Sequence, residues 1–394
     1  MRIILFYSGI ESFNYFTDEI DNELKKRGCE TYIWDLNAGS QNSPHSYDGM
    51  LQFCEKGVDA VICFDRLGVN EQVYKEFWNM LECCVVNILM DPPFRFHPLM
   101  EDPPQKYIQF CPDTHHVEYT KKYFPKVKKV MFLPHAGTKP DKPPIPYSER
   151  KYDILFSGTY YNPKIYVDQI YNLVGGNSIL FEIYMDAAQD LFANRQKTLE
   201  QALMDALTGH NISLDTTFFK SLMRLSEPLD WMVRMHYREL VIKELLDAGF
   251  ELFVIGRGWE NFPKKERHKL NILSDRIPFK QTFYYMENAK INLNIMPCFK
   301  GGTHDRVFNS LLLKSVCLTD TSSWLLRNFT DGEDIAFYSL TGLETLPGKV
   351  KSLLENEEKS KKIIENGYKK VSDNFVWKNN VDVILREISL MMGK

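Results

Sequence analysis

Short apolar runs alternate with amphipathic stretches along most of the chain. The first run, at 2–7, is followed by a stretch with helical spacing at 12–27 and by another apolar run at 30–35. The helical stretch has acidic residues early and basic residues late, and Gly28 ends it. The alternation continues, with strands expected at 58–65, 84–90, 107–111 and 129–133 and helices at 71–81 and 114–123. Strands that alternate with helices predict a parallel sheet covered on both faces.

A proline-rich segment interrupts this pattern at residues 138–150. It reads T-K-P-D-K-P-P-I-P-Y-S-E-R, and its four prolines forbid a helix and favour an extended connector. We therefore expect a first α/β domain at 1–137 and a linker at 138–150.

A second alternation begins after the linker. Strands are expected at 152–157, 251–255, 272–277, 291–296, 316–319 and 335–339. The stretch 163–246 has few strand signals and is rich in Ala, Leu, Met and Gln, which predicts several inserted helices. The predicted fold class is α/β with two doubly wound, Rossmann-like halves. The second domain covers 151–375, and a last helix follows the aromatic break N-F-V-W and occupies 376–394.

Composition and charge exclude several classes of protein. The 394 residues are 44% hydrophobic and 25% charged, which is ordinary for a globular protein and excludes a disordered or collagen-like chain. Lys and Arg total 48 against 52 Asp and Glu, a net charge of −4, so no overall positive field recruits nucleic acid. We expect a cytoplasmic protein without a transmembrane segment, because no apolar run approaches the length of a spanning helix.

Familiar nucleotide and metal motifs are missing from the sequence. No G-x-x-x-x-G-K-[ST] loop and no full dinucleotide fingerprint occur, and the eight cysteines include no C-x-x-C pair. Gly256-Arg257-Gly258 follows an expected strand, at the edge where ligands bind in such sheets, although it could equally be a simple turn. The small-residue turn Ser157-Gly158 ends another expected strand in the same way.

The strongest local signal is C-F-K-G-G-T-H-D-R-V-F-N-S at 298–310, between an expected strand and a helix. The glycines Gly301 and Gly302 let a backbone approach an anion, amides at the helix start donate to it, and Arg306 adds a fixed positive fork. This arrangement predicts a cradle for a diphosphate. The alternative is a Gly-Gly turn in which Arg306 pairs with a surface carboxylate.

The run G-G-T-H-D-R-V-F-N-S-L-L-L-K-S-V-C-L-T-D resembles the H-x-R-x-F block of CgeB-like (spore maturation protein) glycosyltransferases, which have the GT-B fold. The pieces F-L-P-H-A-G before the linker, D-I-L-F-S-G after it, D-G-E before a late strand and F-V-W before the last helix agree with the resemblance. It covers most of the second domain. In the first domain, D-P-P-F at 91–94 is the less specific counterpart.

The resemblance implies two domains that face a cleft, with a nucleotide-sugar donor held by the second and the acceptor by the first. It also implies that the last helix crosses back to the first domain. Donor-binding positions carried over from the family, or placed with them at strand ends, are Ser157, Gly158, Gly256, Arg257, Gly301, Gly302, His304, Arg306, Asn309, Asp320 and Thr321. Many retaining GT-B enzymes have two glutamates where this chain has Gly301 and Asn309, so the stereochemical outcome stays open.

No Asp-x-Asp pair occurs, so we expect no metal and no cofactor, with Arg306, helix dipoles and amides meeting the charge of the leaving group. Asp320 could alternatively be a helix N-cap. Candidate bases on the acceptor side are His97 and His135, either of which could instead be a structural histidine.

The sequence thus predicts a metal-independent glycosyltransferase that uses a nucleotide-diphosphate sugar, in particular a UDP-sugar, and a protein or glycan acceptor. The alternatives are a nucleotide-sugar epimerase of the same fold and a non-catalytic sugar-nucleotide-binding partner in a glycosylation complex.

Overall fold

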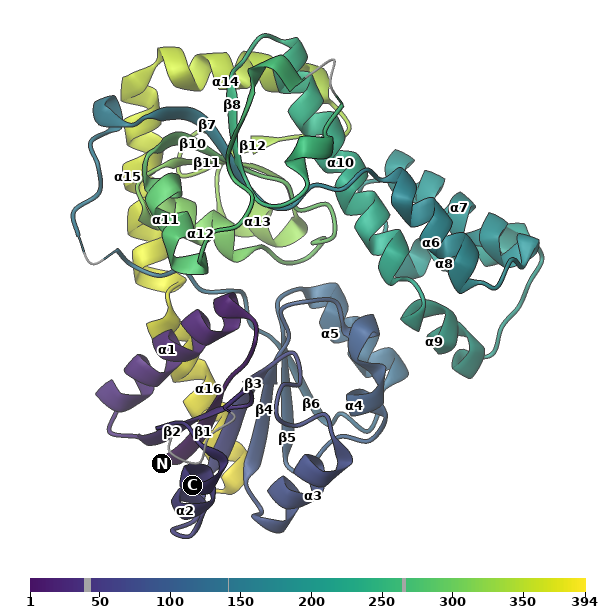
Figure 1. Cartoon of the computed structure of the whole chain (residues 1–394), viewed down its shortest axis with the longest axis vertical. Coiled ribbons are helices and arrows are strands. Elements are labelled where there is room, and N and C mark those ends of the chain that lie inside the picture. The colour runs from purple at the N-terminus through teal and green to yellow at the C-terminus, as the bar shows by residue number, and fades with distance from the viewer. Residues whose placement is uncertain (39–43, 141, 264–266) are drawn as a thin grey trace. The chain divides into compact units, whose positions relative to one another are not determined.

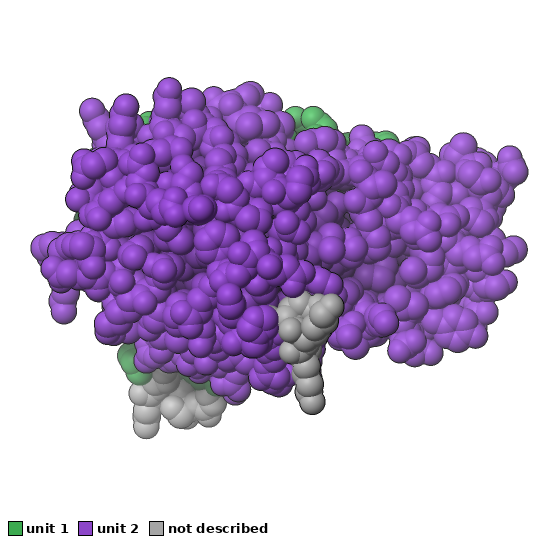
Figure 2. All heavy atoms as spheres, turned by 90° about the horizontal axis from the view of Figure 1, so that it is seen from above, with its two compact units in different colours: residues 1–138, 374–394 green, residues 139–373 purple. Residues whose placement is uncertain are grey.

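The computed structural model describes residues 1–38, 44–140, 142–263 and 267–394. The chain divides into two compact units, which Figure 2 colours separately. Unit 1 comprises Met1–Thr138 and Asn374–Lys394, and unit 2 comprises Lys139–Asp373. In the described residues, no helix is long and apolar enough to cross a membrane.

Unit 1 is built on a six-stranded sheet with the order β2-β1-β3-β4-β5-β6 (Figure 1), in which every neighbouring pair is parallel. Its strands are β1 (Arg2–Tyr7), β2 (Glu30–Asp35), β3 (Ala60–Phe64), β4 (Cys84–Ile88), β5 (Tyr107–Cys111) and β6 (Lys129–Phe132). The helices between them are α1 (Glu11–Lys26), α2 (Tyr47–Cys54), α3 (Gln72–Met80), the 3-10 turn η1 (Pro93–Phe96), α4 (His97–Glu101) and α5 (Thr114–Tyr123). Strands β3, β4 and β5 are buried along their whole length, as strands covered on both faces must be.

The last helix of the chain, α16 (Trp377–Met392), belongs to unit 1 and packs on α1. The ring of Trp377 lies 5.2 Å from that of Phe16 in α1, and Arg27 pairs with Asp382 at 2.7 Å. The backbone of Gly137 also donates to the carbonyl of Phe375, so the chain returns to unit 1 beside the point where it leaves.

Unit 2 has a second six-stranded parallel sheet, with the order β12-β11-β10-β7-β8-β9. Its strands are β7 (Tyr152–Ser157), β8 (Leu252–Ile255), β9 (Leu270–Ser274), β10 (Ala289–Asn294), β11 (Val316–Asp320) and β12 (Ala336–Tyr338). The helices that accompany the sheet are α10 (Glu227–Asp247), α11 (Phe279–Glu287), α12 (Asp305–Leu312), α13 (Ser323–Asn328), α14 (Leu346–Glu355) and α15 (Glu357–Asn374). Short 3-10 turns lie at Tyr147–Glu149, Trp259–Asn261, Arg267–Lys269 and Leu343–Thr345.

A group of helices separates β7 from β8 in the sequence. It consists of α6 (Lys164–Leu173), α7 (Ser178–Ala193), α8 (Leu199–Gly209) and α9 (Thr216–Arg224), which lie around the N-terminal half of the long helix α10 (Figure 1). The predicted fold class, two doubly wound α/β halves with a helical insertion in the second, is therefore confirmed.

The structure differs from the expectations in detail. The strand expected at 272–277 lies at Leu270–Ser274, and the helix expected at 71–81 lies at Gln72–Met80. Part of the expected linker is anchored in unit 2, because Arg150 is buried and donates to the carbonyls of Ala289 and Leu313. Residue 141 of that linker lies outside the described residues.

Candidate functional site

The strand order of unit 2 marks one position at the edge of its sheet. From β7 the chain proceeds outward through β8 and β9 on one side, and then through β10, β11 and β12 on the other. Ligands of doubly wound sheets bind where the order reverses, at the carboxyl ends of the strands. In this unit that position lies between the end of β7, at Ser157, and the end of β10, at Asn294.

Arg306 spans this position from the first turn of α12. Its Nη1 donates to the carbonyl of Ser157 at 2.5 Å, and its Nε donates to Oδ1 of Asn294 at 3.2 Å. Neither partner is a surface carboxylate, so these bonds differ from the alternative expected from the sequence. The hydroxyl of Ser157 is buried and finds no hydrogen-bond partner among the residues that the structure describes.

Two further arginines, Arg234 and Arg238 of α10, lie near Arg306. Neither was predicted from the sequence as a site residue. The guanidinium carbons of Arg238 and Arg306 lie 5.6 and 5.8 Å from the centre of the same ring, that of Phe156. Arg238 is buried and donates to the carbonyl of Thr159, whereas its Nε has no hydrogen-bond partner within the described part of the chain. Arg234 forms an ion pair with Asp230, one turn earlier in α10, at 2.9 Å.

The three arginines repel one another electrostatically. Burial lowers the pKa of Arg238, and the charges of Arg306 and Arg234 lower that pKa further. Burial and Arg234 likewise lower the pKa of Arg306, although Asp305 opposes the change. An arginine stays protonated in a protein, so this crowding costs free energy in the unliganded site. A bound anion would remove that cost, and the cluster therefore favours a ligand with more than one negative charge.

His304 adds a polar group at the start of α12. It is the N-cap of the helix, and its Nδ1 accepts a hydrogen bond from the backbone of Arg306 at 3.3 Å. Burial and the neighbouring Arg306 lower the pKa of His304, with Asp305 acting in the opposite direction. The same nitrogen also contacts a carboxylate oxygen of Asp305, so the positive charge that faces a ligand comes from the arginines and the N-terminus of α12.

Two glycines allow the backbone to come close to this cluster. A side chain at Gly158 would place its Cβ 3.0 Å from the ring of Phe156 and 3.2 Å from Nη1 of Arg306. Gly256 has φ +134°, and a Cβ there would lie 2.4 Å from the carbonyl oxygen of Gly158. The side chain of Arg257 is exposed, while its carbonyl accepts from the backbone of Tyr160 at 2.9 Å. The turn after β8 therefore supports the turn after β7.

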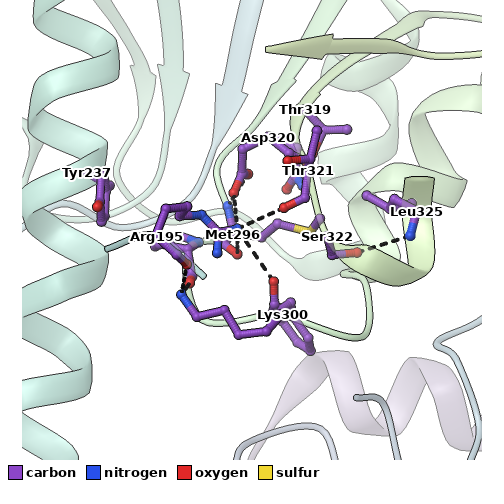
Figure 3. A network of polar contacts seen from close by, with 12 residues as sticks. Arg195, Tyr237, Met296, Lys300, Thr319, Asp320, Thr321, Ser322 and Leu325 are labelled. Carbon is purple, nitrogen blue, oxygen red and sulfur yellow. Dashed lines mark hydrogen bonds and ion pairs between the residues drawn. The ribbon is translucent and has the colours of Figure 1, made fainter. Parts of the chain in front are cut away.

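Other predicted donor residues lie in or beneath the loop that joins β10 to α12. Gly301 and Gly302 are buried in that loop, and the hydroxyl of Ser322 donates to the carbonyl of Gly302 at 2.5 Å. Asn309 is buried in α12 and donates to Asp305. Figure 3 shows Asp320 and Thr321 at the end of β11, beside Arg195. The N-cap of the following helix is Ser322, so the alternative role of Asp320 as an N-cap is wrong.

The two candidate bases lie in unit 1, as does an acidic residue that the sequence reading missed. His97 is buried and forms a 2.8 Å hydrogen bond with the hydroxyl of Tyr119, and His135 is also buried. Asp65 follows β3, and its Oδ1 accepts from the backbone of Met90 at 2.8 Å. Burial and the nearby charge of Asp91 raise the pKa of Asp65 to about 8.

The sequence did contain a signal for the missed arginines. Asp230, Arg234 and Arg238 are spaced four residues apart, so they share one face of a helix. Asp230 and Arg238 are buried in α10, where charged side chains are rare unless they serve a ligand or a partner. For Asp65, the signal is a pair of consecutive residues with positive φ, Asp65 at 43° and Arg66 at 68°, which only the structure reveals.

Comparison with known proteins bears on the fold and on the class of protein. Residues 236–386 match the family described as "Glycosyl transferase-like". No curated protein matches the chain. Among solved structures, a glycosyltransferase from Rickettsia africae ESF-5 is similar with a TM-score of 0.56 and 10% identity, over 99% of this chain and 98% of that one.

Two more similar structures support the same fold. Sucrose-phosphate synthase from Thermosynechococcus elongatus has a TM-score of 0.56 and 8% identity, over 100% of this chain and 99% of that one. Anabaena Alr3699/HepE, solved with UDP and glucose, has a TM-score of 0.53 and 9% identity, over 99% and 100%. The predicted GT-B fold is confirmed by these likenesses, and a glycosyltransferase domain is confirmed by the family match over residues 236–386. The narrower likeness to CgeB-like enzymes stays a prediction.

Proposed function

We propose that the protein is a metal-independent glycosyltransferase that transfers a sugar from a UDP-sugar to a protein or glycan acceptor. The observation that carries the proposal is the cluster of Arg234, Arg238 and Arg306 at the reversal point of the unit 2 sheet. A diphosphate is the ligand that suits it, because its two or more negative charges match the crowded guanidinium groups and the amides at the start of α12.

The same groups would favour the chemical step. When the sugar leaves, negative charge grows on the diphosphate, and fixed donors already aimed at that charge lower the barrier. Arg306 is fixed by Ser157 and Asn294, and Arg238 by Thr159, so neither guanidinium needs to reorganise during the reaction. In this mechanism the arginines supply the positive charge that a divalent metal supplies in other glycosyltransferases.

The choice of a uridine nucleotide is supported by likeness. Anabaena Alr3699/HepE is described in complex with UDP and glucose, and an α-glucosyltransferase of similar fold is described in complex with UDP. We place the donor on unit 2 and assign the acceptor to unit 1. A CgeB-like protein is our proposal for the family, since the run at 301–320 and its surroundings resemble that group.

Titration calorimetry with UDP, GDP, TDP and their sugars tests the donor. We expect UDP and one UDP-sugar to bind, and the affinity to be unchanged after treatment with EDTA. Slow hydrolysis of that UDP-sugar without an acceptor is the expected enzymatic activity, and it would distinguish the enzyme from a non-catalytic binding partner. Recovery of an isomerised nucleotide sugar would instead identify an epimerase, and a strict requirement for Mn²⁺ would exclude the metal-independent mechanism.

A further inference from the structure

The loop at 297–303, which carries Gly301 and Gly302, is held by two buried cations (Figure 3). One is Arg195, which comes from the segment between α7 and α8 of the helical insertion, and the other is Lys300 of the loop itself. Both side chains are more than nine-tenths buried, at 7% and 6% exposure. Buried cations need hydrogen-bond partners, and those of Arg195 are all on Nη2, because its Nε and Nη1 find none among the described residues.

Arg195 contacts the first part of the loop and the end of the neighbouring strand β11. Its Nη2 donates to Oδ2 of Asp320 at 2.7 Å and to the carbonyl of Thr321 at 3.0 Å. The carbonyls of Met296 and Phe299 lie at 3.5 Å from the same nitrogen. The other carboxylate oxygen of Asp320 accepts from the backbone of Met296 at 2.7 Å. One guanidinium and one carboxylate thus fix where the loop leaves β10.

Lys300 makes the reciprocal contact. Its Nζ donates to the carbonyl of Arg195 at 2.6 Å and to that of Pro297 at 2.7 Å. The carbonyl of Lys300 in turn accepts from the backbone of Ser323 at 2.8 Å. The insertion therefore holds the loop through the side chain of Arg195, and the loop holds the insertion through the side chain of Lys300.

Arg195 is itself fixed by the helix that carries the arginine cluster. The hydroxyl of Tyr237, in α10, donates to the carbonyls of Leu191 and Phe192 at 3.1 and 3.0 Å, which holds the end of α7 just before Arg195. Tyr237 is adjacent in sequence to Arg238 of the cluster. The insertion, α10 and the glycine loop therefore share one network of buried polar contacts.

We propose that Arg195 and Lys300 are positioning residues that keep the glycine loop in its donor-binding conformation and connect it to the helical insertion. The inference rests on the proposed function, since it assigns the loop to the donor. A buried ion pair adds little stability by itself. The carbonyl contacts have a different consequence, because they fix the backbone of a loop that leads directly into the start of α12.

Hydrogen–deuterium exchange and UDP calorimetry on the full chain test this role with the variants Arg195→Gln and Lys300→Met. Lys197→Gln is the matched control, because Lys197 lies in the same segment and pairs with Asp190 and Asp205, away from the glycine loop. We expect faster exchange in peptides that cover 297–303 and a UDP dissociation constant about tenfold higher in both variants, with little change in the control. Arg195→Lys should recover part of the affinity, since it keeps a charge for Asp320.

The outcomes separate the two proposals. If wild-type protein binds no nucleoside diphosphate, the proposed function is overturned, whatever the variants do. If both variants fold and their loop exchange equals that of wild type, the positioning role is overturned, even where UDP binds. Unchanged UDP affinity beside faster loop exchange also overturns it, because the loop would then be held for another purpose. If Arg195→Gln does not fold, Lys300→Met still tests the same contact from the side of the loop.

Discussion

The arginine cluster shows how single residues can mark a site that no short motif records. Arg238 and Arg306 lie over one ring, that of Phe156. The charge of Arg306 lowers the pKa of Arg238, and the charge of Arg234 lowers the pKa of both. Within the cluster, Arg234 also pairs with a carboxylate, that of Asp230. Placing like charges close together in a partly buried site costs electrostatic free energy, and a bound anion would offset that free energy.

The first prediction concerns Arg238. Arg238→Ala should weaken UDP binding by about 1.5–3 kcal/mol, the usual range for a hydrogen bond to a charged group. Calorimetry measures the change directly. Lys243→Ala is the matched control, because Lys243 is an exposed cation on the same helix, and its loss should leave the affinity near that of wild type. Equal affinities in wild type and Arg238→Ala would remove the arginine cluster from the donor site.

A second residue prediction follows from Asp65 in unit 1. Burial and Asp91 raise its pKa from the usual 3.8 to about 8, while Arg95 and two backbone amides oppose the change. The folded state therefore holds this proton more tightly than the unfolded state. The resulting stability is fully present below about pH 4 and is lost as the pH rises to about 8. Asp65→Asn imitates the protonated form, so it should gain stability relative to wild type across that range.

Melting temperatures of both proteins from pH 4 to pH 9 check this expectation. The difference between Asp65→Asn and wild type should grow with pH and then level off. Asp91→Asn should move the upper end of the range to lower pH, because it removes the negative neighbour. A difference that stays constant over the whole range would contradict the raised pKa of Asp65.

At the level of residues, the sequence could predict those parts of the candidate site that are local. Ser157 and Gly158 end a strand, and Arg306 follows a glycine pair, so the order along the chain predicts their place in a parallel sheet. Arg238 reaches Arg306 across 68 positions, and Arg195 reaches Asp320 across 125, so both contacts depend on tertiary packing. From the sequence, Asp320 could be interpreted only as a donor-binding residue or an N-cap. Its partner, Arg195, lies in a segment that is distant in sequence.

At the level of elements, hydrophobic period predicted most strands and helices, and the bounds moved by a few residues. The strand expected at 272–277 ends at Ser274 because pairing with β8 stops there, at an irregularity in register beside Ile255. The helices of the insertion were expected as a group, yet their arrangement could not be derived. Their packing depends on contacts such as that of Tyr237 with the end of α7, which joins segments 45 and 46 residues apart.

The insertion also changes how the loop that joins β10 to α12 is supported. A loop of ten residues between a strand and a helix has little cover of its own, and glycines make it more adaptable. In this chain, Arg195 and Lys300 tie it to the α7–α8 segment, and Ser322 ties Gly302 to the start of α13. The α7–α8 segment and the start of α13 therefore help to determine the conformation of the loop that leads into α12.

At the level of the whole molecule, the chain passes between the two units twice, near residue 138 and near residue 374. Its last helix, α16, completes the cover of a sheet formed by the first 132 residues. Trp377, Ile384 and Ile388 are buried, and Glu387 pairs with Lys129 at 2.5 Å. Unit 1 therefore combines two segments that are separated in sequence by the whole of unit 2, whereas unit 2 is continuous in sequence.

The last prediction is that deletion of residues 377–394 unfolds unit 1 and spares unit 2. Without α16, the apolar surfaces of α1 and β4 lose their cover, and the milder variant Trp377→Ala should already cost about 3–5 kcal/mol, as large-to-small core changes do. Hydrogen–deuterium exchange of the full and shortened chains distinguishes the units, with β3 and β4 expected to lose protection and β10 and β11 to keep it. Deletion of 390–394 alone is the control, since it leaves Trp377, Ile384 and Ile388 in place. Equal protection of β3 and β4 in the chain that lacks α16 would show that unit 1 is stable without its returning helix, and the second crossing would then have to be explained by something other than the core of unit 1.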